Sequence, residues 1–327
     1  MTRIGLETAV KASARNARSG RRAVPRVLLV LVAVVALMIG RPARACSVCG
    51  CGDPLLTSSD PAAITGQFRL QLDTEYLRVD AGSEADPSLT DELTQWSFRL
   101  NAVYRPRDAL SLTATLPVVN KAMRMVGGGM SASTSDVTGL GDFELAARYA
   151  LWRGIDLGIG RVQELAFTAG ASMPTGPNDL RSGGQRIDEH GQPGRGSWGP
   201  FAGVHYRVEQ GSWLGFASLS GRAYSENSYE YTYGSALLWS VHGQWFPVKR
   251  LALDLGLDGR YAAVDKDGGE TVANTGGTVL SAAPGVYYNA LGGAWLFVRG
   301  QVPFYTQFRG EQDQLPSVVT GFQYQVL

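Results

Sequence analysis

The stretch that decides the fold is QWSFRLNAVY, residues 95–104, in which apolar and polar side chains alternate. The apolar set, all of one parity, is Trp96, Phe98, Leu100, Ala102 and Tyr104. Because successive side chains of a β-strand point to opposite faces, the segment predicts a strand with one apolar and one polar face. The same alternation runs through residues 66–78 and 250–262.

The alternation recurs in twelve segments, an even number. The predicted strands are residues 66–78, 93–105, 109–121, 139–152, 161–173, 197–208, 212–224, 231–246, 250–262, 278–290, 294–304 and 317–327. Tight turns are predicted at residues 105–108, 209–211, 247–249 and 291–293, with long polar loops between them. Short turns on one side and long loops on the other are typical of outer-membrane barrels, whose turns face the periplasm. Pro284, inside the tenth segment, has no backbone N–H, so it predicts a bulge or a misplaced strand end.

A soluble β-sandwich or a β-solenoid would also show alternation. Two features favour a membrane barrel. The segments commonly span 11 to 14 residues, whereas soluble strands cluster near about 5–6 and membrane strands near about 9–11. Aromatic residues of one parity also lie near both strand ends, as Trp96 and Tyr104 do. The sequence therefore predicts an all-β fold: a transmembrane, antiparallel, up-and-down barrel of about 12 strands over residues 66–327, with the lipid of the bacterial outer membrane as its partner.

The first 45 residues have the features of a signal peptide. Arg21, Arg22 and Arg26 precede one apolar run, Val27 to Gly40, and the sequence Ala43-Arg44-Ala45 follows it. The run is shorter than the roughly 20 residues that a spanning helix needs, and small residues mark a cleavage site. We therefore expect residues 1–45 to be removed, with an uncleaved anchor as the alternative.

Removing this segment makes the remaining chain acidic. Residues 1–45 contain nine of the 30 Lys and Arg residues but only one of the 29 Asp and Glu residues, which leaves an excess of seven acidic residues. Proteins that bind nucleic acids neutralise phosphates with Lys and Arg. We therefore expect no nucleic acid among the partners.

Four segments resemble the outer-membrane family of transporters named for the meta-pathway of phenol degradation. They are Leu116-Pro117-Val118-Val119, Gly139-Leu140-Gly141-Asp142-Phe143-Glu144-Leu145, Met173-Pro174-Thr175-Gly176 and Gly199-Pro200-Phe201-Ala202-Gly203. The resemblance extends loosely over residues 66–327 and implies a porin-like barrel with a transport role. The chain departs from the pattern of such barrels at its last residue, Leu327, where an aromatic residue is usual.

If the apolar faces contact lipid, a balanced set of charged residues faces the lumen. The predicted lumen-lining residues are Arg69, Asp73, Glu75, Arg99, Asp142, Glu144, Arg148, Glu164, His205, Arg207, Arg222, Asp254, Asp258, Arg260 and Arg299. Two interpretations stay open: ion pairs that stiffen the wall, or a narrow channel whose charged rows orient a polar solute.

No catalytic motif stands out. Neither G-x-S-x-G nor H-E-x-x-H occurs in the sequence. Of the three histidines, His190 falls in a long loop, and His205 and His242 have inward parity. We therefore predict that the protein is not an enzyme.

All three cysteines, Cys46, Cys49 and Cys51, follow directly after the predicted cleavage site. Their C-x-x-C-x-C spacing makes them candidate ligands for a soft metal ion, Cu(I) or Zn, with a further ligand from elsewhere. The alternatives are one disulfide with a leftover thiol, since exported chains meet an oxidising compartment, and lipidation of Cys46. With twelve strands, residues 46–65 would form a periplasmic N-terminal segment and linker.

Two functional hypotheses follow. The first is a porin-like transporter of small molecules, hydrophobic or aromatic ones among them. The second is a barrel-anchored protein that binds a metal or docks a periplasmic partner through the cysteine cluster.

Overall fold

The structure of the protein is a computed structural model that describes residues 68–82, 90–125, 133–310 and 312–326. The predicted signal peptide, residues 1–45, and the cysteine segment, residues 46–65, lie outside the described residues, as do all three cysteines. Those interpretations therefore stay predictions. No helix of the described ranges is long and apolar enough to cross a membrane.

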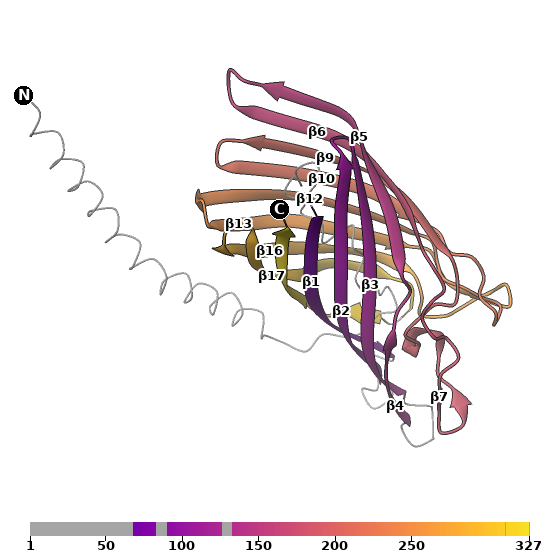
Figure 1. The fold of residues 1–327 in the computed structure, drawn as a ribbon. Helices are drawn as coiled ribbons and strands as arrows, with labels where there is room; N and C mark the ends of the chain where they lie inside the picture. Colours follow the sequence, from indigo (N-terminus) through magenta and orange to yellow (C-terminus); the bar gives the residue numbers. More distant parts are fainter. Residues whose placement is uncertain (1–67, 83–89, 126–132, 311, 327) are drawn as a thin grey trace, which may run out of the picture. The chain divides into compact units, whose positions relative to one another are not determined.

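Antiparallel strands of the described residues form one large closed sheet (Figure 1). Its strands are β1 (Phe68–Gly82), β2 (Thr90–Arg107), β3 (Leu110–Met125), β4 (Ser133–Leu140), β5 (Glu144–Asp156), β6 (Arg161–Ser172), β9 (Gly199–Gln210), β10 (Trp213–Arg222), β12 (Ala236–Val248), β13 (Leu251–Ala262), β16 (Gly277–Leu291), β17 (Ala294–Phe308), β18 (Gln312–Gln314) and β19 (Ser317–Val326). The short β18 and β19 both pair with β1 and count as one strand of the wall. Since β4 and β5 both pair with β3, they form one interrupted strand, and the barrel has twelve. The predicted fold class is confirmed.

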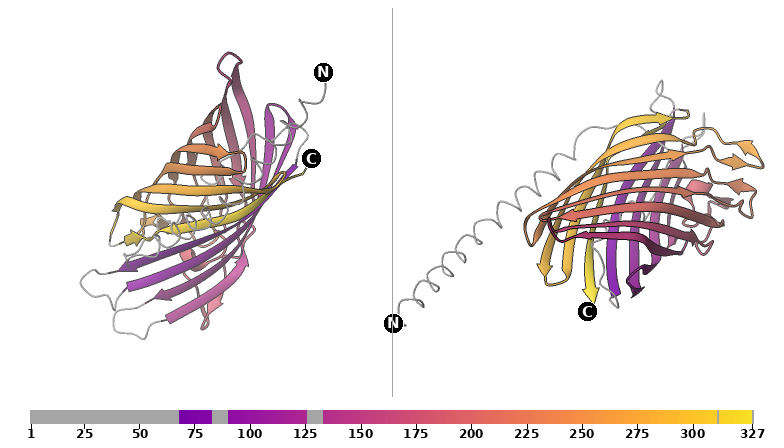
Figure 2. Two further views of the ribbon diagram at one scale, coloured as in Figure 1. Left: turned by 90° about the vertical axis from the view of Figure 1, so that its left-hand side faces the viewer. Right: turned by 90° about the horizontal axis from the view of Figure 1, so that it is seen from above.

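The barrel closes because β1 pairs with strands from both ends of the sheet. Phe68 lies opposite Tyr104 of β2 and opposite Val326 of β19. The two views of Figure 2 show the strands wrapping around a common axis. In hydrocarbon an open edge would leave N–H and C=O groups unpaired, and closure removes that cost.

Outward and inward side chains separate cleanly along the strands. On β2, Trp96, Phe98 and Leu100 are 42%, 44% and 44% exposed, whereas the neighbouring Ser97 and Arg99 are 3% and 1% exposed. The exposed surface is thus apolar and the interior polar, the reverse of a soluble protein. Only lipid accommodates such an outer face, and closed barrels of this kind belong to the bacterial outer membrane.

Short turns and long loops lie at opposite ends of the barrel. The short turns join β2 to β3, β5 to β6, β9 to β10, β12 to β13 and β16 to β17. The start of β1 and the end of β19 lie at the same end as these turns, the periplasmic end by the rule for such barrels. The turn at residues 157–160, between β5 and β6, was not among the predicted tight turns.

The sequence placed one strand at residues 139–152, but the structure divides this region. Strand β4 ends at Leu140, and β5 begins only at Glu144. Among the described strands, β4 pairs with β3 alone, because β6 leaves the wall after Ser172. The wall is therefore interrupted beside residues 141–143.

Pro284 lies within β16 without ending it. The pairing of β16 with β13 continues through Leu255 opposite Pro284. Against β17 the register shifts between Leu280 and Ser281, and the pairing omits Ala283 and Pro284 before it resumes at Gly285. The missing N–H of Pro284 is thus tolerated inside a continuous strand, with a bulge close by.

Three long connections fold together at the other end of the barrel. We name them loop A (residues 173–198), loop B (residues 223–235) and loop C (residues 263–276). Loop A contains the hairpin β7 (Arg181–Ser182) and β8 (Gln185–Arg186) and the 3-10 turn η3 (Glu189–Gly191). Loop B contains β11 (Tyr231–Thr232), which pairs with β14 (Lys266–Asp267) of loop C; β14 in turn pairs with β15 (Glu270–Thr271).

Candidate functional site

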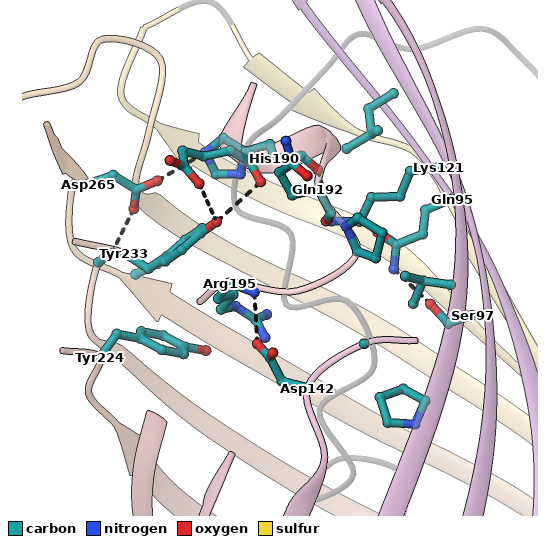
Figure 3. Close-up of a pocket in the computed structure, with 18 of the residues that line it drawn as sticks. Gln95, Ser97, Lys121, Asp142, His190, Gln192, Arg195, Tyr224, Tyr233 and Asp265 are labelled. Atoms are coloured by element: carbon teal, nitrogen blue, oxygen red, sulfur yellow. Dashed lines mark hydrogen bonds and ion pairs between the residues drawn. The ribbon is translucent and has the colours of Figure 1, made fainter. Parts of the chain in front are cut away.

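A cavity of about 100 Å³ lies between loop A and the inner face of the barrel (Figure 3). Strands β2, β3 and β13, the break between β4 and β5, and all three loops contribute to its lining. Most of its polar side chains are charged, among them Arg99, Asp142, Arg195 and Arg260. We take this cavity as the candidate functional site.

The break in the wall fixes both ends of loop A through one carboxylate. Asp142 is buried, with its Oδ1 atom accepting from the backbone N–H of Gly176 at 3.1 Å and its Oδ2 atom from that of Arg195 at 2.8 Å. Phe143 donates its backbone N–H to Thr175 Oγ1 at 2.8 Å. In an unbroken strand the backbone N–H of Phe143 would belong to the ladder, and the interruption between β4 and β5 leaves it available to loop A.

The crossing of the loop ends needs glycine. A Cβ atom on Gly194 would lie 2.3 Å from the carbonyl oxygen of Gly176, and one on Gly139 would lie 2.9 Å from Pro193 Cγ. Two of the segments that carry the family resemblance, residues 139–145 and 173–176, therefore meet at this crossing.

Strand β3 holds the middle of loop A. Lys121 donates through Nζ to the carbonyl oxygens of His190 at 2.9 Å and Gln192 at 2.7 Å. Gln192, 1% exposed, closes the loop on itself: its Nε2 atom donates to the carbonyl oxygens of Leu180 and Ile187. The turn η3 is thus fixed against the barrel interior.

Loops A, B and C meet at a histidine, a tyrosine and an aspartate. His190 Nε2 lies 3.0 Å from Asp265 Oδ2 and 3.1 Å from the hydroxyl oxygen of Tyr231, which donates to the same Asp265 oxygen at 2.7 Å. Burial acts to lower the pKa of His190, but the hydrogen bond and the charge of Asp265 outweigh it and raise that pKa. Burial acts to raise the pKa of Asp265, but the hydrogen bond and charge of His190, together with the hydrogen bonds from Gly234 and Tyr231, outweigh that effect, and the pKa falls. The pair therefore favours its charged form.

A second group joins loops A and B. Glu189 is buried, and its carboxylate lies 2.8 Å from Arg186 Nη1 and accepts from Asn227 Nδ2 at 3.3 Å. Tyr233 donates its hydroxyl to the carbonyl oxygen of Glu189 at 3.2 Å. Burial, with the charge of Glu189 adding to it, raises the pKa of Tyr233, so this hydroxyl remains a donor at neutral pH.

Deeper in the barrel, charged side chains bind one another. Arg99 donates to Asp73 at 2.6 Å and to Glu75 at 2.7 Å. On the strands β12, β13 and β17, His242 lies 3.0 Å from both Asp254 and Asp258, and Arg299 donates to Asp258. A side chain facing a wide aqueous pore would be exposed, whereas Arg99, Asp73, His242, Asp258 and Arg299 are all less than 5% exposed.

The remaining residues predicted to line the lumen lie on the same inward parity. Arg222 donates to Glu144 with its Nη2 atom 3.3 Å from Oε2, and Arg148 lies 3.0 Å from Glu164. Arg69 is buried, and His205 and Arg207 are half-buried, with Arg207 2.8 Å from Glu209. Four of the predicted residues line the cavity: Arg99, Asp142, Glu144 and Arg260.

Sequence reasoning did not single out the loop residues of the cavity. Gln192, Arg195, Tyr233 and Asp265 line it, and none of these four follows from strand alternation, because they lie on irregular backbone. Lys121, which also lines the cavity, lies on β3 and was not singled out either. The glycines and prolines of residues 173–176 and 193–196 were the one signal that these ends are closely packed. No group of three His, Cys, Asp or Glu side chains in the described ranges is placed to hold a metal ion.

A closed antiparallel barrel with an apolar outer face is the architecture of outer-membrane β-barrel proteins. The fold is shared with an outer membrane channel from Pseudomonas putida F1, with a TM-score of 0.63 and 15% identity, covering 82% of this chain and 99% of that one. At this identity the likeness shows a common fold.

Two further solved barrels match with lower TM-scores of 0.41. The translocator domain of the autotransporter NalP from Neisseria meningitidis is 12% identical, covering 96% of this chain and 97% of that one. A mutant of TodX, a monoaromatic hydrocarbon channel, is 10% identical, covering 89% of this chain and 97% of that one. No protein-family profile and no curated protein matches the sequence, so the family resemblance stays a prediction.

Proposed function

We propose that the protein is an outer-membrane channel for small molecules and that its route passes through the cavity beneath loop A. The observation that carries the proposal is the fixed position of this loop, which Asp142 and Lys121 hold against the barrel interior. A barrel that is only an anchor gains nothing from a loop folded over a polar cavity. A channel gains a constriction that selects solutes by size and charge.

The size of the cavity and the packing below it restrict the solute. At about 100 Å³ the cavity is smaller than the roughly 300–1,000 Å³ of pockets for drug-sized ligands. The buried network of Arg99, Asp73 and Glu75 further narrows the path. We therefore expect slow passage of small solutes and a low ion conductance. The resemblance to the family named for phenol degradation favours aromatic solutes.

A variant that weakens the attachment of loop A to the barrel tests the proposal. The full mature protein is reconstituted in planar bilayers, and its conductance is compared with those of Asp142→Asn and Asp179→Asn. Asp142→Asn weakens the acceptor that holds both loop ends, so we expect a larger conductance. Asp179 is an exposed residue of the same loop, and its substitution should leave the conductance unchanged. Absence of ion and solute passage in both the parent and Asp142→Asn would overturn the proposal.

The cysteine cluster supports a second candidate function, metal binding or docking of a periplasmic partner. Cys46, Cys49 and Cys51 fall within six residues of one another, and thiolates at such spacing suit Cu(I) or Zn. Metal analysis of the reduced protein beside a variant with all three cysteines changed to serine tests it. Equal, near-zero copper and zinc contents in both proteins would remove the metal hypothesis.

A further inference from the structure

The cavity beneath loop A has more cationic donors than its carboxylates use. We propose that it binds the carboxylate group of a small organic acid and that Arg195 and Arg260 hold this group. The binding site is independent of the proposed channel. Only the statement that the bound acid is the transported solute rests on that proposed function.

The carboxylates that line the cavity already have hydrogen-bond or ion-pair partners. Its four carboxylates are Asp142, Glu144, Glu189 and Asp265. Each of them takes the hydrogen bonds or the ion pair described above, from backbone N–H groups or from a basic side chain. The charge of Asp142 acts on Arg195, but none of the four carboxylates forms an ion pair with Arg195 or Arg260 within the described chain.

Two of the lining arginines form no ion pair with any residue that the structure describes. Within the described chain, the guanidinium of Arg195 makes no ion pair and lies 5.1 Å from the ring centroid of Tyr224 and 5.7 Å from that of Tyr233. Arg260 also makes no ion pair with a described residue, and its Nε atom is buried without a hydrogen-bond partner. Both guanidinium groups belong to residues that line the cavity, and an anion there would accept charge-assisted hydrogen bonds from them.

The innermost lining residue of β2, Arg99, adds a third guanidinium group to the wall of the cavity. Arg99 is 1% exposed; its Nε and Nη1 atoms are bound to Asp73 and Glu75, and its Nη2 atom is buried without a partner in the described residues. Planar guanidinium groups match the two oxygens of a carboxylate, which makes arginine the preferred residue for such recognition.

The cavity favours a monoanion with a small apolar body. Leu93 and Val119 provide apolar wall, and the rings of Tyr224 and Tyr233 flank Arg195. Since a dry cavity of about 150 Å³ binds benzene, about 100 Å³ accommodates a carboxylate group and the carbons next to it, and the ring of an aromatic acid would extend out of the cavity. The four lining carboxylates repel a second negative charge, so a dianion such as phosphate is disfavoured.

Calorimetry on the full mature protein in detergent micelles tests the inference with three probes. Benzoate carries the proposed group, benzamide is its neutral isostere, and inorganic phosphate is the competing anion. We expect benzoate to bind at least about tenfold more tightly than benzamide, because charge-assisted hydrogen bonds are lost in the amide. Equal binding of benzoate and benzamide, or tighter binding of phosphate, would overturn the inference.

Variants identify the residues that bind the anion. Arg195→Gln and Arg260→Gln should each weaken benzoate binding about tenfold, whereas Arg181→Gln, on the exposed hairpin of loop A, should not. Arg260→Lys keeps the charge and should recover part of the affinity, and it serves as the comparison if a glutamine variant fails to fold by circular dichroism. Unchanged affinity in both folded glutamine variants would contradict the assignment.

The outcome is separable from that of the channel proposal. Passage of neutral solutes in liposome swelling together with no benzoate binding would remove the anion site and keep the channel. Benzoate binding by a protein that passes no solute would keep the anion site and remove the channel.

Discussion

His190 of loop A and Asp265 of loop C are 3.0 Å apart, which joins two loops that are distant in the sequence. The raised pKa of His190 makes the contact stabilising below the ordinary histidine value of 6.5, and the stabilisation is lost as the pH rises through the raised pKa. Because the pKa of Asp265 is lowered, this carboxylate stabilises the fold above its ordinary pKa of 3.8, and the stabilisation is lost as the pH falls through the lowered pKa. The contact is therefore strongest between about pH 3.8 and 6.5.

We predict that the conductance in bilayers rises as the pH increases from 6 through the raised pKa of His190, because loop A loosens. His190→Gln should remove this dependence, whereas His205→Gln, on the barrel wall, should retain it. The same rise in His190→Gln as in the parent protein would show that another group controls the loop.

Gly194→Ala should displace loop A. The new methyl group would lie 2.3 Å from the carbonyl oxygen of Gly176, a backbone atom that cannot move away cheaply. We expect faster trypsin cleavage after Arg181 in folded protein, since a displaced loop opens more often. Gly243→Ala, where a Cβ atom meets nothing within 4 Å, is the control, and equal cleavage rates in the two variants would contradict the prediction.

Arg99→Met should be strongly destabilising. It leaves Asp73 and Glu75 buried without their cation, and breaking a buried ion pair costs about 3–5 kcal/mol. Arg78→Met is the matched control, because the Arg78 side chain is 41% exposed beside Asp80 and exposed pairs contribute about 0–1 kcal/mol. Urea unfolding in lipid vesicles measures the free energy of unfolding of both variants. Equal decreases for Arg99→Met and Arg78→Met would show that the buried network does not stabilise the barrel.

Leu100→Arg tests the membrane-facing surface. Leu100 lies midway between the outward Trp96 and Tyr104 and is 44% exposed. An arginine on the lipid face near the bilayer midplane costs about 2–4 kcal/mol. Leu157→Arg, in the exposed turn between β5 and β6, should cost little by the same unfolding assay. A negligible loss for Leu100→Arg would argue that this face does not contact lipid.

The barrel was predictable because the alternation of apolar and polar side chains can be read from neighbouring residues of the sequence. Alternation such as that of Trp96 and Ser97 is set by neighbouring residues and by the two solvents on either side of the wall. The same alternation indicated the inward parity of Arg99, Asp258 and Arg299, although it did not indicate which charges pair with one another.

The loop-covered cavity was not predictable by such reasoning. Lys121 meets Gln192, and Gly176 meets Gly194, only after the barrel has brought distant segments together. The break after Leu140 was also missed, because its glycines are compatible with a strand and only the packing of loop A requires the interruption.

The missing strand partner of β4 has a consequence for how this protein can diverge or be engineered. Loops that merely connect strands of a barrel tolerate exchange, deletion and grafting. Loop A does not belong to that group, because its ends pack against residues 139–143, where the neighbouring strand has left the wall. We expect insertions to accumulate at the tip of its hairpin β7–β8, while the length and the glycines of its two ends remain fixed as part of the barrel itself.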